Sequence, residues 1–163
     1  MTDSDNNIVY KPKFIFWFVS NFFLFALIAF IVLLSNSYKQ YEVVKYAGAF
    51  LSLGIFIFLF YKYIDVLLCT KWIVTDEQIL IKKGVFSKSV NYIELYRVYD
   101  YEEKKTFVQA LCRNTTIFIH SGDKSHPILC MYGLKEDDTI IPTIRKRVEK
   151  QRQLKQIYEF TNR

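Results

Sequence analysis

Two long apolar runs dominate the first half of the chain. The first, residues 14–34, carries no charge, and its polar side chains are those of Ser20 and Asn21. The second, residues 46–61, is also uncharged. As α-helices they would be about 32 and 24 Å long, beside about 30 Å for the hydrocarbon core of a bilayer. The pattern predicts a two-helix transmembrane hairpin with helices at 14–34 and 45–68, the second continuing beyond the membrane plane.

Two alternatives for the first run fit less well. A core helix of a soluble protein has a polar face, whereas this run is apolar all round. A cleavable signal peptide would suit Lys11, Lys13 and the small residues at 35–37, but its apolar region is normally only about 7 to 15 residues long. Tyrosines also cluster where the aromatic belts of a membrane interface belong: Tyr10, Tyr38, Tyr41, Tyr46, Tyr61 and Tyr63.

The lysines around the two runs predict an orientation. Four flank the open end of the hairpin and two lie in or beside its loop: Lys11, Lys13, Lys62 and Lys71 against Lys39 and Lys45. The positive-inside rule then places both termini and the domain that follows in the cytoplasm. We expect an integral protein of the inner or cell membrane with two spans.

Small residues in the second run predict close helix packing. Gly48 and Ser52 form a small-xxx-small step that suits contact with the first helix, and Asn21 is a candidate interhelical hydrogen-bond donor. The alternative, that Asn21 marks a ligand site inside the membrane, rests on a single amide.

After Cys69 the apolar period changes from helical to two, which predicts β-strands. The expected strands lie at 70–75, 78–83, 88–93, 97–104, 115–120 and 127–132. A single helical turn is expected at 106–111. The chain then ends in an amphipathic helix, with Asp137 or Asp138 as N-cap, Pro142 in the first turn and apolar positions continuing to Tyr158.

These elements divide the chain into four parts. They are an N-terminal tail at 1–13, the helical hairpin at 14–69, an α+β domain at 70–150 and a C-terminal helix extension at 151–163.

Several stretches of the α+β domain carry a family resemblance. They are Trp72 to Glu77, Ile79 to Ser87, Ile93 to Val98 and Met131 to Leu134. Directly behind an apolar helix pair, this pattern resembles the bacterial pleckstrin-homology-like (PH-like) domain of the YdbS type, also called the membrane-flanked domain. The resemblance implies a bent antiparallel sheet of about six to seven strands, a near-barrel plugged by the C-terminal helix. The family pattern commonly has Pro where Glu94 stands and Ser where Tyr96 stands.

Little in the sequence supports a catalytic site or a metal-binding site. The three cysteines are odd in number and have no CxxC spacing, so neither a disulfide framework nor a zinc site is indicated. His120 and His126 flank a turn that contains Asp123, with Cys130 nearby, but a metal site needs three or four converging ligands. A Cys112 nucleophile with His120 as base has no local signature. We expect no enzyme, no cofactor and no bound metal.

The net charge of +6 is modest, and no concentrated basic face with a nucleic-acid readout element is present before the last helix. Lipid-binding domains of this fold resemble one another in placing Lys and Arg around the first hairpin turn, whereas here Asp76 and Glu77 make that turn acidic. The candidate contacts with an anionic lipid surface are therefore nearby lysines: Lys62, Lys71, Lys82, Lys83 and Lys88.

We expect a non-catalytic, membrane-tethered binding or scaffold module. The leading hypothesis is a protein partner or self-association, through an open sheet edge or the last helix. The apolar residues that would dock there lie past the expected end of the domain: Leu154, Ile157, Tyr158 and Phe160. The alternatives are sensing of an anionic lipid surface by the basic side of the domain and, more distantly, a membrane-bound enzyme. No nucleic acid and no small-molecule substrate are expected.

Overall fold

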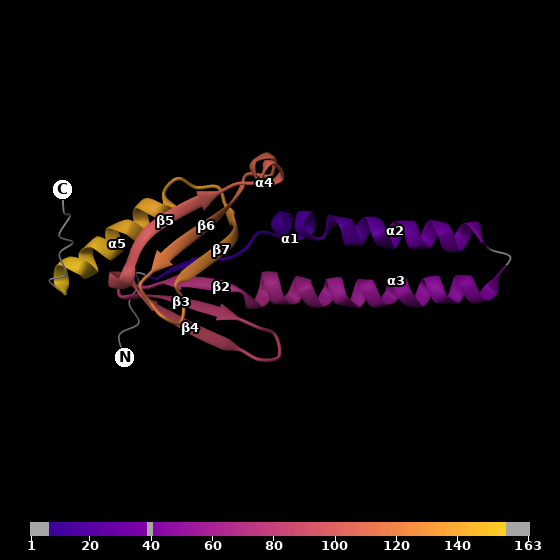
Figure 1. Cartoon of the computed structure of the whole chain (residues 1–163), viewed down its shortest axis with the longest axis horizontal. Helices are drawn as coiled ribbons and strands as arrows, with labels where there is room; N and C mark the ends of the chain where they lie inside the picture. The colour runs from indigo at the N-terminus through magenta and orange to yellow at the C-terminus, as the bar shows by residue number, and fades with distance from the viewer. Residues whose placement is uncertain (1–6, 39–40, 156–163) are drawn as a thin grey trace.

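The computed structural model describes residues 7–38 and 41–155, and it has two parts. An arm of apolar helices projects from one end of a β-rich domain, and the last helix lies at the opposite end of that domain (Figure 1). The expected order of a helical N-terminal region followed by an α+β domain is confirmed.

The arm consists of α1 (Phe14–Ser20), α2 (Phe22–Ser37) and α3 (Glu42–Tyr63), and the π-helical segment η1 (Ile64–Cys69) continues α3. Helices α2 and α3 run side by side in opposite directions (Figure 1). Among the described residues, the helix Glu42–Cys69 is long and apolar enough to cross a membrane, and α1 with α2 adds a second such unit only if the bent pair counts as one span.

The single helix predicted at 14–34 is wrong, because the chain bends by 55° between α1 and α2. Asn21 leaves helical geometry at the bend, and its side-chain Nδ2 donates to the carbonyl of Trp17 at 2.7 Å. The backbone N–H of Lys13 donates to the carbonyl of Gly133 at 2.8 Å, which ties the start of α1 to the domain. The bend lets α1 follow the domain surface while α2 runs away from it.

Within the described residues, seven strands form two antiparallel sheets. The first sheet contains β1 (Ile8–Tyr10), β2 (Lys71–Val74), β3 (Gln78–Lys83) and β4 (Ser89–Glu94), in that order. The second contains β5 (Val98–Lys104), β6 (Asn114–Ser121) and β7 (Ile128–Lys135). All six predicted strands are present, within one to three residues of their expected ends.

Strand β1 lies within the residues that the sequence analysis assigned to an N-terminal tail. It pairs with β2, with Tyr10 opposite Trp72. Three residues are too short a segment for a period of two to be recognised, and the strand forms because β2 offers it an unpaired edge.

The near-barrel expected from the resemblance is not observed, because no closed barrel forms in the described part of the chain. A 3₁₀ turn, η2 (Leu95–Arg97), leads from β4 into β5, and the two strands do not pair with each other. The domain therefore consists of two sheets that share a core rather than one continuous sheet.

Helix α5 (Ile140–Leu154) covers the core at the end of the domain distant from the arm (Figure 1). Its buried face includes Ile144 and Val148, and Pro142 falls in its first turn as expected. Two arginines bind both sheets: Arg147 donates to the carbonyl of Val74 in β2, and Arg152 donates to that of Val98 in β5. The helix thus holds the two sheets together, which explains why the core needs no closed barrel.

Candidate functional site

Four lysines in or next to the first sheet line one cavity at the arm end of the domain. The cavity has a volume of about 440 Å³, and its wall includes Lys71 of β2, Lys82 and Lys83 of β3, and Lys88 just before β4. Leu68 and Cys69, at the end of the arm, complete the side nearest the helices. We call Lys71, Lys82, Lys83 and Lys88 the lysine cluster.

Strand register explains why the cluster forms. Lys71 stands directly opposite Lys82 in the antiparallel pair of β2 and β3, and Lys82 is in turn opposite Val90 of β4. Like charges directly opposite each other on a sheet are unfavourable. No member of the lysine cluster forms an ion pair with a carboxylate of the described residues. An anion at this cavity would therefore relieve a repulsion that the fold leaves in place.

The fifth candidate, Lys62, does not join the cluster. It lies in the last turn of α3, where its ammonium group is 5.8 Å from the centre of the Phe58 ring. The structure therefore brings together four of the five lysines that the sequence analysis grouped.

Lys83 also lies near strand β7 of the second sheet, beside two groups whose pKa is raised. Lys83 Nζ lies 5.7 Å from the centre of the Tyr132 ring. Burial raises the pKa of the Cys130 thiol, and the charge of Lys83 opposes this only in part. Burial also raises the pKa of Tyr132. Because the thiolate is the reactive form of cysteine, this environment does not activate Cys130 as a nucleophile.

An aromatic junction between the arm and the domain was not expected from the sequence. The ring of Phe16 in α1 lies 5.4 Å from that of Tyr132, which in turn lies 5.1 Å from Trp72 in the core. Gly133 adopts a left-handed backbone with φ of 65°, and a Cβ there would lie 2.5 to 2.7 Å from atoms of Phe16. The glycine allows α1 to approach β7 closely.

Trp17 forms the second half of this junction. It is 7% exposed, and its ring centre lies 5.4 Å from that of Tyr63 at the end of α3. The signal for the junction was present in the sequence as two polar residues, Ser20 and Asn21, inside an otherwise apolar run. Of the two, Asn21 was predicted to be an interhelical hydrogen-bond donor instead.

The predicted packing residues of the arm have separate roles. A Cβ on Gly48 would collide with the Ser35 side chain of α2, so this glycine does lie at the contact of α2 and α3. Ser52 donates to the carbonyl of Ala49 in its own helix. Asn21 likewise bonds within its own chain segment, at the bend. Of the three, Gly48 is the one placed against the neighbouring helix.

The docking helix predicted at the C-terminus is described only in part. Leu154 is 67% exposed at the end of α5 that points away from the arm (Figure 1). Ile157, Tyr158 and Phe160 lie outside the described residues. Leu154 therefore lies at the opposite end of the domain from the lysine cluster.

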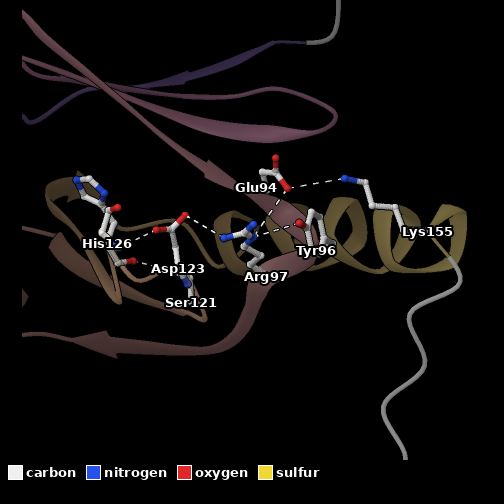
Figure 2. A network of polar contacts seen from close by, with 8 residues as sticks. Glu94, Tyr96, Arg97, Ser121, Asp123, His126 and Lys155 are labelled. Atoms are coloured by element: carbon white, nitrogen blue, oxygen red, sulfur yellow. Dashed lines mark hydrogen bonds and ion pairs between the residues drawn. The ribbon is translucent and has the colours of Figure 1, made fainter.

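The two departures from the family pattern meet in one polar network at this far end (Figure 2). Arg97 Nε lies 3.1 Å from the Tyr96 hydroxyl and 3.9 Å from Glu94 Oε2. Lys155 Nζ lies 3.8 Å from the same Glu94 atom and 4.0 Å from the centre of the Tyr96 ring. Glu94 and Tyr96 thus hold the end of α5 against η2, a structural role on an exposed surface.

The turn suggested as a possible metal site belongs to the same network. Asp123 lies 3.6 Å from Arg97 Nη1, and its carboxylate accepts from the backbone of Ser125 at 2.8 Å, which lowers its pKa (Figure 2). The described residues contain no group of three or more His, Cys, Asp or Glu side chains arranged to hold a metal. His120 lies 4.0 Å from Glu102 on the neighbouring strand instead.

Comparison with protein families agrees with this architecture. The family model described as "Bacterial PH domain" matches residues 15–156, which include both the apolar arm and the β-rich domain. The chain belongs to the bacterial PH domain family. The search of curated proteins and the search of solved structures found no match. The family resemblance is thereby confirmed, while the narrower likeness to the YdbS type stays a prediction. Membership of this family indicates a binding or scaffold module.

Proposed function

We propose that this bacterial PH domain protein is a membrane-tethered, non-catalytic binding module whose lysine cluster contacts the anionic head groups of the host membrane. The arm is the tether, with α2 and α3 in the bilayer and the domain in the cytoplasm. The observation that carries the proposal is the placement, around a cavity beside the end of the arm, of four lysines that have no carboxylate partner among the described residues.

The exposed apolar surface of the arm supports its proposed role as a membrane tether. Large apolar side chains project from it on all sides, such as Phe23 with 85% and Phe50 with 81% of their area exposed. In water such a surface would be an aggregation hazard, whereas lipid acyl chains would cover it. The length of α3 with η1, Glu42–Cys69, meets the requirement for a span.

The position of the lysine cluster supports the choice of ligand. Leu68 and Cys69 continue directly from α3, so the cavity opens beside the level at which the arm would leave the membrane. Basic side chains near an anionic membrane surface contribute about 1 kcal/mol each. Four of them would favour phosphatidylglycerol or similar lipids over neutral ones.

Two measurements on the full chain test the proposal. Extraction of membranes with alkaline carbonate checks the tether, because an integral protein stays in the pellet. Native mass spectrometry in mild detergent then checks the head-group site, by comparing retained phosphatidylglycerol with retained phosphatidylcholine. In the double variant Lys71→Gln, Lys82→Gln the preference for phosphatidylglycerol should fall by roughly tenfold or more, because each lysine contributes about 1 kcal/mol.

A matched control uses two exposed lysines far from the cavity. The double variant Lys124→Gln, Lys146→Gln removes the same charge from the β6–β7 turn and from α5. It should leave the lipid preference unchanged. An equal loss in both double variants would show that net charge, and not the lysine cluster, sets the preference.

A protein partner is the second candidate, and an open sheet edge favours it. Strand β4 pairs with β3 alone, and it exposes Tyr92 and Val90 on its surface. An extended segment of a partner or of a second copy could add to this edge. Co-purification of a stoichiometric partner in mild detergent, lost in the variant Tyr92→Lys but kept in Tyr99→Lys on β5, would support this candidate.

A further inference from the structure

We propose that the domain has two apolar anchors of its own, Phe86 and the outer face of helix α4 (Phe107–Leu111), which insert into the interface of the bilayer that holds the arm. This inference rests on the proposed membrane tether and adds an interaction surface to it.

The first anchor is the turn between β3 and β4. Phe86 is 89% exposed, and its ring lies nearly parallel to that of Tyr61 in the last turns of α3, with 6.0 Å between their centres. A phenylalanine at the tip of a tight turn contributes nothing to the core of the domain. Its contact with Tyr61 places it at the end of the apolar part of α3, where a tyrosine commonly marks the membrane interface.

The second anchor is α4, on the other side of the arm. A reciprocal capping box of Thr106 and Gln109 fixes this short helix, and Gln109 also donates to Thr116 of β6 at 3.0 Å. The helix then presents Phe107 and Leu111, four residues apart and 85% and 77% exposed, on one face. The polar side of α4 is thus bound to the sheet, and its largest apolar side chains point away from it.

Position relative to the arm identifies the bilayer as the occupant. Residues of α1 and α4 line one cavity of about 260 Å³, so α4 lies beside the helix that precedes α2. Both the β3–β4 turn and α4 are on the arm side of the domain, on opposite sides of the helices (Figure 1). A soluble partner would have to fit around the arm to contact both anchors, whereas a membrane surrounds the arm on every side.

The length of the arm makes the same point. Helix α2 has 16 residues, or about 24 Å, which is about 6 Å short of the hydrocarbon core of a bilayer. The missing depth falls at the domain end, where α1 bends aside and exposes Phe14 and Phe18. The boundary of the bilayer therefore reaches the level of α1 and, with it, of Phe86 and α4.

The charges nearby suit an interfacial position. Lys82, Lys83 and Lys88 border the Phe86 turn and belong to the lysine cluster. Beside α4, Lys105 is held by Glu103 and Glu136, at 3.2 and 2.6 Å. The Phe86 anchor is thus bordered by cations that form no ion pair with a carboxylate in the described part of the chain, and we expect it to gain more from anionic lipid than α4 does.

The test adds one tryptophan at a time to the full chain, reconstituted in vesicles of phosphatidylcholine with a minority of phosphatidylglycerol. The variants are Phe86→Trp, Phe107→Trp and the control Leu154→Trp, whose position is exposed at the far end of the domain. Emission is compared between vesicles with ordinary lipids and vesicles whose acyl chains carry bromine, a quencher. The native Trp17 and Trp72 contribute equally to all variants and are subtracted.

The added emission of Phe86→Trp and Phe107→Trp should be blue-shifted and mostly lost in brominated vesicles, and that of Leu154→Trp should be neither. Emission at 86 or 107 that behaves like that at 154 overturns the proposal for that anchor. Failure of the tether is distinguishable, because alkaline carbonate would then release the unmodified protein. All three substitutions are at exposed sites outside the core, and circular dichroism checks that the fold is kept.

Discussion

The arm and the β-rich domain use the same residue types in opposite ways. In the domain, a set of apolar side chains forms a shared core, in which Trp72 and Ile79 are fully buried. In the arm most large apolar side chains are exposed: α2 buries none, and the buried exceptions are Trp17 in α1 and Leu59 in α3. The difference teaches that most hydrophobic residues of the arm have no protein core to join, so the stability of the two parts depends on different surroundings.

The strongest test of this contrast is truncation of a large apolar side chain in each region. Trp72→Ala in the core should cost about 3 to 5 kcal/mol of unfolding free energy, because it leaves a cavity that the neighbours cannot fill. Phe50→Ala in α3 should leave the unfolding of the domain unchanged. Chemical denaturation of the full chain in detergent micelles measures both, and equal losses would contradict the separation.

The junction between the two regions can be tested at Gly133. Gly133→Ala puts a Cβ against Phe16 at a position with φ of 65°, and should cost about 2 kcal/mol through backbone strain and displaced packing. Hydrogen exchange at the amides of α1 should rise together with this loss. Gly54→Ala is the control, since a Cβ there has nothing within 4 Å. Unchanged exchange in Gly133→Ala would mean that α1 is not held by this contact.

Within the arm, Gly48→Val should disturb the packing of α2 on α3 by about 1 kcal/mol, because the new side chain meets Ser35. Thermal melting of the helices in detergent, followed by circular dichroism, measures the change. Gly54→Val is the matched control on the same helix. The melting of the two variants should differ even though both add the same β-branched side chain to α3.

The smallest expected effect concerns a buried hydroxyl in the domain. Burial raises the pKa of Tyr101 to about 12, and its hydroxyl has no hydrogen-bond partner in the described part of the chain. The neutral phenol is therefore favoured in the folded state. The folding stability that depends on the neutral phenol is fully present below pH 10 and is lost as the pH rises towards 12. Tyr101→Phe should be neutral or slightly stabilising at pH 7 and should flatten the loss of stability at alkaline pH. A steeper alkaline loss in the variant would contradict this assignment.

The sequence predicted most of the domain because its signals are local. Alternation along β2 and β3 marks strands with one buried face, and the helical turn expected at 106–111 is the short helix α4. The division into two sheets was not predictable in the same way. It depends on how η2 turns the chain and on the long-range bonds of Arg147 and Arg152, which no local pattern reports.

The candidate lysine site could be predicted only as far as the sequence indicates which strands pair and in which register. Lys71 and Lys82 converge because the register of β2 and β3 sets them opposite each other, and Lys83 and Lys88 lie at the two ends of the β3–β4 connection. The bend at Asn21 was missed because an apolar run of spanning length hides a change of direction, and Asn21 was interpreted as an interhelical hydrogen-bond donor. Phe86 and Phe107 were missed because exposure, not composition, distinguishes them.

The pairing of β1 with β2 has a mechanical consequence for the arm. These two strands are neighbours in the first sheet, and the entire arm is inserted between them in the chain. The arm is therefore the loop of a β-hairpin, enlarged into a helical rod, and both of its ends are fixed at adjacent points of the sheet. A sliding of α2 past α3 would have to shear Tyr10 against Trp72 or be absorbed by the bend at Asn21. The bend is then the flexible point between α1 and α2. A force on the helices is transmitted to the sheet through β1 and β2 at the same time.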